Sequence, residues 1–125
     1  MTPIQTPNAP AAIGPYSQAI RHGDLLFVSG QIPIDPATGE FNSDDAAEQI
    51  RQCLKNIAAI AEAAGTSLKN TIKTTILTTE LSRFADINAA YGEFFSAPYP
   101  ARATFEVSTL PRGAKVEVEA IIAIA

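Results

Sequence analysis

The segment Ser43–Gly65 reads SDDAAEQIRQCLKNIAAIAEAAG and carries the clearest periodic pattern of the chain. Its apolar side chains repeat at spacings of three and four, which is the pattern of an amphipathic helix with one buried stripe. The members of that stripe are Ala47, Ile50, Leu54, Ile57, Ala61 and Ala64. Ser43 is expected to cap the amino end of this helix, and Gly65 is expected to end it.

Downstream of this helix, the segment 70–79 (NTIKTTILTT) is rich in β-branched residues and predicts a strand. Ser82 is expected to cap a second helix of similar length, which the prolines of 97–100 end. Apolar residues of this second helix again repeat at helical spacing: Phe84, Ile87, Tyr91 and Phe94 or Phe95. Two further strands are predicted at 102–107 and 115–124.

Upstream, the segments 17–21 and 25–29 predict a hairpin that turns at His22-Gly23-Asp24. Four prolines fall within the first fifteen residues, so this arm is expected on a surface course or at a sheet edge. The order ββαβαββ predicts an α+β two-layer sandwich, with one mixed sheet and two helices on one face. We expect a single domain over residues 1–125.

The predicted strands carry more apolar side chains than one layer of helices needs to cover: Ile72, Ile76, Leu77, Val107, Ile121 and Ile122. A sheet with a second apolar face tends to bury that face against another subunit. The sequence therefore favours a homo-oligomer.

Composition excludes several classes of function. The 125 residues hold 9 Lys+Arg against 13 Asp+Glu, and the basic residues are scattered, which argues against a nucleic-acid partner. A single cysteine, Cys53, and a single histidine, His22, exclude a disulfide and the usual zinc sites. No apolar run is long enough for a membrane span and no signal peptide is recognisable, so we expect a cytoplasmic protein without a membrane partner.

Two side chains stand out as candidate chemical groups. Arg102, at the start of a strand, offers a planar donor fork suited to a carboxylate, or is a surface arginine paired with Glu106 or Glu119. Glu117 alternates with valines, so it is a candidate general acid or base, or one residue of a solvated strand face. Spacing alone leaves both alternatives open.

Four other positions are weaker candidates. Ser29-Gly30 ends a strand where a ligand could approach backbone N–H groups, although a simple turn explains the pair equally well. Tyr16 offers a hydroxyl or is a core aromatic residue. Asn88 shares a helix face with Tyr91, which we expect in the core, and Cys53 is expected to be a buried structural thiol.

Five segments, in order, resemble the Rid family of reactive intermediate deaminases, in its archetypal RidA branch. They are APAAIGPYSQA (9–19), FVSGQIPIDPATGE (27–40), AAGTSLKNTIKTTILTTEL (63–81), FADINAAYGEFF (84–95) and PARATFEVSTLPRGAKVEVEAIIAI (100–124). The resemblance implies a chorismate-mutase-like fold and a homotrimer whose sheets form an inner barrel, with sites between subunits. It also implies hydrolysis of enamine or imine acids, such as 2-iminobutanoate and 2-iminopropanoate, to 2-oxo acids and ammonia, without metal or cofactor.

The resemblance also assigns roles to residues. Arg102 matches the arginine that binds the substrate carboxylate, and Glu117 matches the glutamate that activates water. The remaining matches line the substrate site: Tyr16, Ser29, Gly30, Asn88 and Thr104, the last standing where many members have cysteine. The connector 96–100 is shorter than in the enteric archetype, which affects the expected substrate size.

Other functions remain open at this level. A pathway-specific deaminase is one, and a chaperone or a ribonuclease-like translation inhibitor of the same family is another. The presence of both Arg102 and Glu117 favours an enzyme, and the acidic charge disfavours a ribonuclease.

Overall fold

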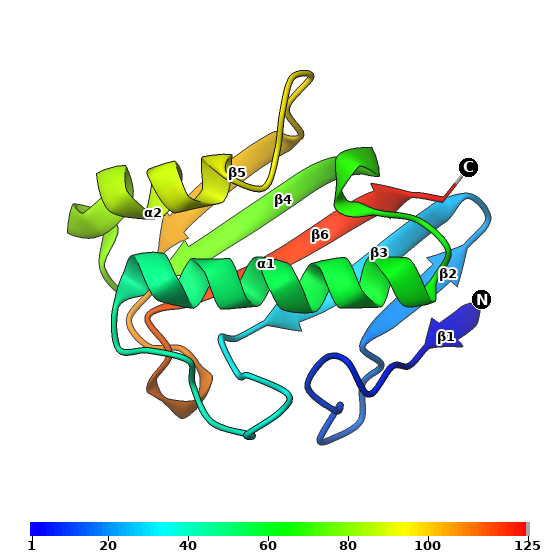
Figure 1. Cartoon of the computed structure of the whole chain (residues 1–125), viewed down its shortest axis with the longest axis horizontal. Coiled ribbons are helices and arrows are strands. Elements are labelled where there is room, and N and C mark those ends of the chain that lie inside the picture. The colour runs from blue at the N-terminus through cyan, green and yellow to red at the C-terminus, as the bar shows by residue number, and fades with distance from the viewer. Residues whose placement is uncertain (125) are drawn as a thin grey trace.

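The computed structural model, which describes residues 1–124, contains one six-stranded sheet with both α-helices on one face (Figure 1). The strand order is β1-β2-β3-β6-β4-β5, and all neighbours are antiparallel except β4 and β5, which are parallel. The strands are β1 (Thr2–Ile4), β2 (Ala19–His22), β3 (Leu25–Gln31), β4 (Thr71–Thr78), β5 (Ala101–Glu106) and β6 (Val116–Ala123). The helices are α1 (Ala46–Ala63) and α2 (Phe84–Gly92). The expected α+β class, with a mixed sheet and two helices on one face, is confirmed.

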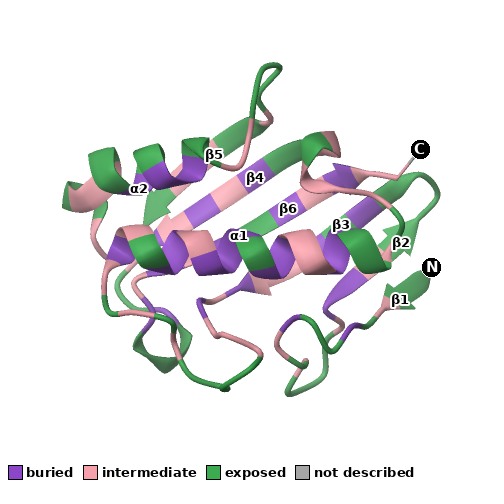
Figure 2. Cartoon of the chain, in the orientation of Figure 1, coloured by how far each residue is buried: buried purple, intermediate pink, exposed green. Residues whose placement is uncertain are grey.

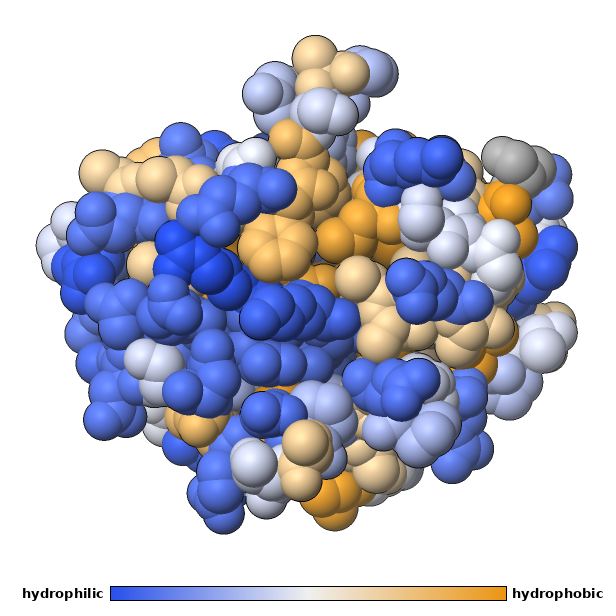
Figure 3. All heavy atoms as spheres, viewed as in Figure 1, coloured by the Kyte–Doolittle hydropathy of each residue, from blue (hydrophilic) through white to orange (hydrophobic). Residues whose placement is uncertain are grey.

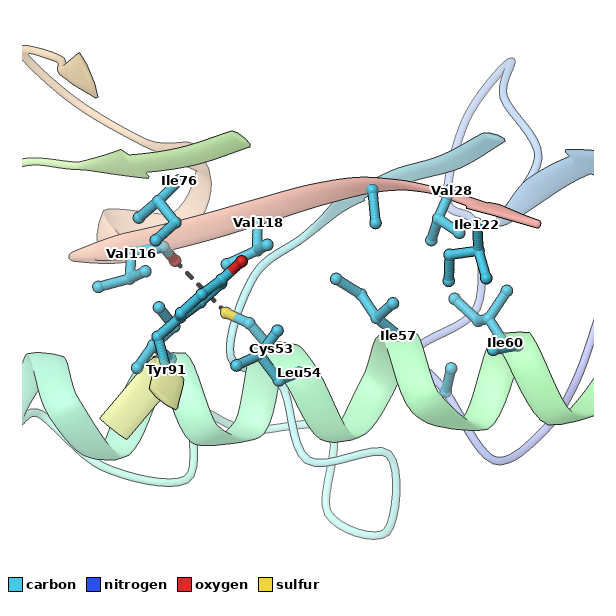
Figure 4. Packing of buried hydrophobic residues seen from close by; sticks show 14 of the residues in the cluster. Val28, Cys53, Leu54, Ile57, Ile60, Ile76, Tyr91, Val116, Val118 and Ile122 are labelled. Atoms are coloured by element: carbon cyan, nitrogen blue, oxygen red, sulfur yellow. Dashed lines mark hydrogen bonds between the residues drawn. The ribbon is translucent and has the colours of Figure 1, made fainter. Parts of the chain in front are cut away.

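The core lies between α1 and the middle of the sheet (Figures 2 and 4). Most of the predicted stripe is buried: Ile50, Leu54, Ile57 and Ala61 are inaccessible to solvent, whereas Ala47 and Ala64 are partly buried. It packs on side chains that alternate along the central strands: Leu26, Val28, Ile76, Val116, Val118 and Ile122. Each such side chain contributes roughly 1.5–3 kcal/mol on burial, so this layer accounts for much of the hydrophobic stabilisation.

The first helix begins later than expected. Asp45, not Ser43, is the N-cap residue, and its carboxylate accepts a hydrogen bond from the backbone N–H of Glu48. Ser43 instead accepts from the N–H of Asp45, so it fixes the turn that precedes the cap. Asp45 also forms an ion pair with Arg83 at 2.9 Å, which links this helix end to α2 and lowers the pKa of Asp45.

The expectation of two helices of similar length is wrong, because α1 has 18 residues and α2 has nine. Ser82 does not cap α2; it lies in a short 3-10 turn, Leu81–Arg83, that precedes the helix. Phe94 and Phe95 follow the end of α2 and lie outside it, although the ring of Phe95 still packs on Tyr91 at 4.7 Å between centroids.

The proline-rich arm adds a sixth strand. Residues Thr2–Ile4 form β1 at the edge of the sheet, where Pro3 needs no outer partner. Buried Gln18 holds the following segment: its amide accepts from Thr6 N and donates to the carbonyls of Thr6, Ala9 and Pro10. The sheet-edge course expected for the arm is confirmed.

The face of the sheet away from the helices, here called the open face, carries apolar side chains. Three of them are at least one-third exposed: Leu25, Phe27 and Phe105. Of the apolar strand residues counted in the sequence, Ile76 and Ile122 are covered by the helices, because strand alternation turns them inward. Among residues 1–124, no helix has the length and apolar character needed to cross a bilayer.

Candidate functional site

Arg102 lies on the edge strand β5 and points to the helix side of the sheet. Its partner across the parallel pairing is Thr74, which is buried beneath α2. The Nη1 group of Arg102 donates to Oδ1 of Asn88 at 2.7 Å. The guanidinium carbon lies 4.9 Å from the ring centroid of Tyr91 and 5.5 Å from that of Phe84. One amide and two aromatic rings of α2 therefore fix the orientation of the arginine.

Tyr91, whose ring lies under the Arg102 guanidinium, is itself held in place by a hydrogen bond. Its hydroxyl shares a 2.7 Å hydrogen bond with Oγ1 of buried Thr74, which ties the ring to β4. Burial raises the pKa of Tyr91, an effect opposed by the Thr74 hydrogen bond and by the Arg102 charge. The phenol therefore stays neutral, and Arg102 stacks on an uncharged ring.

The guanidinium of Arg102 has no carboxylate partner among residues 1–124, since every ion pair there involves other cations. Glu106, one alternative partner considered for it, accepts from the backbone N–H of Leu81 at 3.0 Å. Glu119, the other, lies on the opposite face of the sheet. The donors of Arg102 other than Nη1 are thus available to an anionic ligand.

Glu117 lies on β6 and points to the open face, because Val116 and Val118 on either side of it are buried toward the helices. Its carboxylate occupies the space above Gly30 of β3, where a Cβ would overlap the carboxylate and come within 2.9 Å of its Cδ. Burial raises the pKa of Glu117, and the neighbouring charge of Glu119 raises it further. A glycine is therefore required at position 30 to let this carboxylate sit against the backbone.

Ser29 and Gly30 lie at an irregularity in the pairing of β3 with β6, between Val28 and Gln31. The hydroxyl of Ser29 donates to the carbonyl of Ser17 at 2.6 Å, and its N–H donates to the carbonyl of Gln18 at 3.0 Å. These bonds join the bulge to the segment that carries Tyr16. The strand-end feature seen in the sequence is therefore more than a simple turn.

Tyr16 and Gly30 line one cavity of about 290 Å³, together with Gln31, Ile34, Pro111 and Arg112. Tyr16 is about half exposed, and its hydroxyl accepts from the N–H of Ile13 at 3.4 Å. The reading of Tyr16 as a core aromatic residue is therefore wrong.

The candidate residues thus fall into two groups. One group, here called the arginine cluster, lies on the helix side of the sheet and comprises Phe84, Asn88, Tyr91, Arg102 and Thr104. The other, the glutamate cluster, comprises Tyr16, Ser29, Gly30 and Glu117. Because Arg102 and Glu117 point to opposite faces of the sheet, one chain does not bring the two clusters into a single site.

Sequence reasoning missed the role of Phe84 and Tyr91, which it placed in the hydrophobic core. The spacing of Phe84, Asn88 and Tyr91, at i, i+4 and i+7, already placed all three on one helix face. What the sequence could not supply was the position of β5, which brings Arg102 over that face. Arg112, which lines the cavity beside Tyr16, was also missed.

Cys53 is buried, and its Sγ donates to the carbonyl of Val116 at 3.7 Å (Figure 4). Burial raises the pKa of this thiol well above its usual range, so it is unsuited to act as a nucleophile. The part of the chain described, residues 1–124, contains no cluster of three His, Cys, Asp or Glu side chains that could hold a metal ion.

Comparison with known proteins gives consistent matches over nearly the whole chain. The family described as Endoribonuclease L-PSP matches residues 6–124. A RutC family protein of Sinorhizobium fredii is 68% identical over 122 residues, which are 98% of this chain and 97% of the relative. The Escherichia coli K12 protein named 2-iminobutanoate/2-iminopropanoate deaminase is 50% identical over 121 residues, 94% of each chain. The crystal structure of E. coli TdcF with bound serine has a TM-score of 0.94 at 42% identity and covers 100% of both chains.

Proposed function

The chain belongs to the Endoribonuclease L-PSP family, also called YjgF/RidA, and we propose that it hydrolyses reactive 2-imino acids and their enamine tautomers. The products are a 2-oxo acid and ammonia. Relatives from E. coli and mouse, 50% and 43% identical, bear the name 2-iminobutanoate/2-iminopropanoate deaminase. The observation that carries the proposal is the oriented guanidinium of Arg102, which has no carboxylate partner within the described chain.

Arg102 binds the carboxylate of the substrate. A guanidinium fixed by Asn88 and by the ring of Tyr91 offers its free N–H groups in a fixed direction, so little conformational entropy is lost on binding. Thr104, two residues along the same strand face, lies where its hydroxyl or backbone could contact the imine nitrogen.

Glu117 supplies the acid–base step. As a carboxylate it takes a proton from water while the water oxygen bonds to the electrophilic imine carbon, and it returns that proton to the nitrogen, which gives a tetrahedral carbinolamine. The same carboxylate then moves the hydroxyl proton of the carbinolamine to the nitrogen, the C–N bond breaks, and ammonia leaves as the C=O bond forms. The raised pKa of Glu117 brings it closer to neutral pH, where a group can both accept and return a proton efficiently.

Two copies of the chain are needed to complete this site. The arginine cluster and the glutamate cluster lie on opposite faces of the sheet, so we propose a homotrimer in which Arg102 of one copy meets Glu117 and Gly30 of its neighbour. The exposed apolar side chains of the open face, Phe27 and Phe105 among them, provide the surface that assembly would bury. Light scattering is expected to give a mass of about three chains, and a monomer would contradict the shared site.

The deaminase is tested with threonine dehydratase and threonine, which generate 2-aminocrotonate and 2-iminobutanoate. The purified protein is expected to speed the release of 2-oxobutanoate above the spontaneous rate. The variant Arg102→Ala is expected to lose on the order of a hundredfold or more of this acceleration. Arg21→Ala is the matched control, because Arg21 is exposed on β2 and donates only to the carbonyl of Gly23. No acceleration at any protein concentration would refute the proposal.

The surface does not favour RNA as the main substrate, despite the description of the family. Four of the nine basic residues lie within 4.0 Å of acidic groups: Arg51, Arg83, Arg112 and Lys115. Figure 3 shows hydrophilic side chains over much of α1, and the one arginine of that helix, Arg51, is paired with the carboxylates of Glu48 and Glu93. A single-stranded RNA incubated with the purified protein is expected to remain intact under conditions in which the imine is consumed.

A further inference from the structure

Arg112 brings a second positive charge to the site proposed above. It lies in the short turn Pro111–Gly113 and borders the 290 Å³ cavity that Tyr16, Gly30 and Gln31 also line. Among the described residues that line this cavity, it is the only charged one. An anion that enters the cavity therefore meets one cation among the residues of the lining.

The backbone at Arg112 adopts a tight, restricted turn. Arg112 has a φ of 58°, in the left-handed region that residues other than glycine rarely adopt. The following Gly113 also has a positive φ, of 75°. This tight turn restricts the backbone that carries Arg112 at the border of the cavity, so less conformational entropy is lost when the residue binds a ligand.

The contacts of the guanidinium leave it free to bind a ligand. Its carbon lies 5.7 Å from the ring centroid of Phe41, and Nη2 reaches the carbonyl of Gly39 only at 3.5 Å. The nearest carboxylate, on Glu40, is at 4.0 Å and is mostly exposed to water. Such a distant, solvated pair contributes little, so a better-placed anion can displace it.

The volume of the cavity is larger than 2-iminobutanoate and 2-iminopropanoate, the substrates in the names of the relatives, require. Its volume equals roughly ten water molecules at about 30 Å³ each, more than the ethyl group of 2-iminobutanoate requires. Since Arg102 of the neighbouring copy takes the α-carboxylate, Arg112 is left for a second anionic group on the substrate side chain.

We propose that Arg112 is a specificity-determining residue and that the site accepts 2-imino dicarboxylic acids, such as 2-iminosuccinate, in addition to small 2-imino monocarboxylic acids. The inference rests on the proposed deaminase function and names a substrate class for it. Hydrolysis takes the same steps as for 2-iminobutanoate: water adds to the imine carbon, ammonia leaves, and 2-iminosuccinate becomes oxaloacetate.

The test compares two substrates made in the assay, 2-iminosuccinate from aspartate with an aspartate oxidase and 2-iminobutanoate from threonine with threonine dehydratase. In Arg112→Gln, which keeps a polar side chain of similar length, kcat/KM for 2-iminosuccinate is expected to fall roughly tenfold, while that for 2-iminobutanoate changes less than about twofold. Arg112→Lys is expected to keep part of the preference. Arg21→Gln, which removes an exposed charge on β2, is expected to change neither value.

A binding readout separates specificity from damage to the fold. Unreactive succinate is expected to inhibit the wild type competitively, and its inhibition constant is expected to rise by at least fivefold in Arg112→Gln, whereas inhibition by butanoate stays unchanged. Equal losses on both substrates, or no loss on 2-iminosuccinate, would overturn the role of Arg112 and leave the deaminase proposal standing. Absence of wild-type activity on 2-iminobutanoate would refute the deaminase proposal itself.

Discussion

At the scale of single residues, Arg102 is placed by side chains that a sequence reading assigns to the core. Tyr91 has only 5% of its surface exposed, yet its ring face supports a guanidinium 4.9 Å away. Its hydroxyl is held by Thr74, and Asn88 fixes the arginine from the side. In the proposed site, a buried aromatic residue thus acts on ligand binding through the arginine that it orients.

Replacement of Tyr91 separates this positioning role from a purely structural one. Tyr91→Phe keeps the ring and is expected to leave the KM for 2-iminobutanoate within about twofold, at a cost to stability of about 1 kcal/mol from the lost Thr74 hydrogen bond. Tyr91→Leu removes the ring and is expected to raise KM on the order of tenfold, with a smaller change in kcat. Steady-state kinetics of both variants provide the measurement. A Leu variant with lowered kcat but unchanged KM would indicate general damage to the fold.

The pH dependence reports on Glu117. Burial, and to a lesser extent the charge of Glu119, raises the pKa of Glu117 above 4.5. As the pH falls, Glu117 is therefore protonated, and stops acting as a base, at a higher pH than a free glutamate. The rate constant kcat/KM is therefore expected to fall as the pH decreases through this raised value. In Glu119→Gln the second cause is removed, and the acidic limb of the profile is expected to move to lower pH. An unmoved limb, or a shift to higher pH, would show that Glu119 does not act on Glu117.

At the scale of elements, much of the fold could be predicted because its patterns are local. The stripe of α1 and the alternation along β6 come directly from side-chain periodicity, and both are confirmed. The N-cap was misplaced because Ser43 and Asp45 are both good caps, and only the contact with Arg83 from a distant segment favours Asp45. β1 was not predicted because three residues carry no recognisable period; its pairing with β2 forms it.

The buried face of α1 also carries polar side chains that no periodicity explains. Asn56 donates to the carbonyl of Ile34 at 2.9 Å and accepts from Gln52 at 2.9 Å. Gln49 donates to the carbonyl of Ser43 and accepts from the N–H of Lys115. These amides anchor the loops at one end of the sheet, including the 31–34 segment beside the glutamate cluster. The hydrogen-bond partners of these amides lie in loops distant in sequence, so their role could not be predicted from the sequence of α1 alone.

The Glu117 side chain of β6 lies directly against the backbone of Gly30 on β3. In Gly30→Ala the added Cβ would overlap the Glu117 carboxylate, which must then leave its position over the bulge. Activity on 2-iminobutanoate is expected to fall by at least about tenfold, since small misplacements of a catalytic group are costly. Gly92→Ala is the matched control: its Cβ would meet nothing within 4 Å, so it is expected to leave activity unchanged and to stabilise α2 by up to about 1 kcal/mol. Full activity in Gly30→Ala would remove Glu117 from the proposed site.

At the scale of the whole molecule, the two faces of the sheet differ in character. The helix side is covered by α1 and α2, and Figure 3 shows its outer surface to be largely hydrophilic, with apolar groups gathered near the base of the connector after α2. The open face, to which Glu117 and Glu119 of β6 also point, leaves Phe27 about 41% and Phe105 about 54% exposed. A chain that keeps its proposed base on an apolar face, and its proposed carboxylate binder on the other face, is suited to act in an assembly.

The separation of Arg102 from Glu117 within one chain gives the sharpest test of that assembly. Arg102→Ala and Glu117→Gln are each expected to be inactive alone, because every site then lacks one of the two groups. When the two variants are unfolded, mixed in equal amounts and refolded together, a site that takes Arg102 from one copy and Glu117 from another is intact in about a quarter of random combinations. Roughly a quarter of the wild-type rate of 2-iminobutanoate hydrolysis per site is therefore expected after mixing. If both groups belonged to one chain, no combination of the two variants would contain an intact site, and a mixture as inactive as its parts would contradict the shared site.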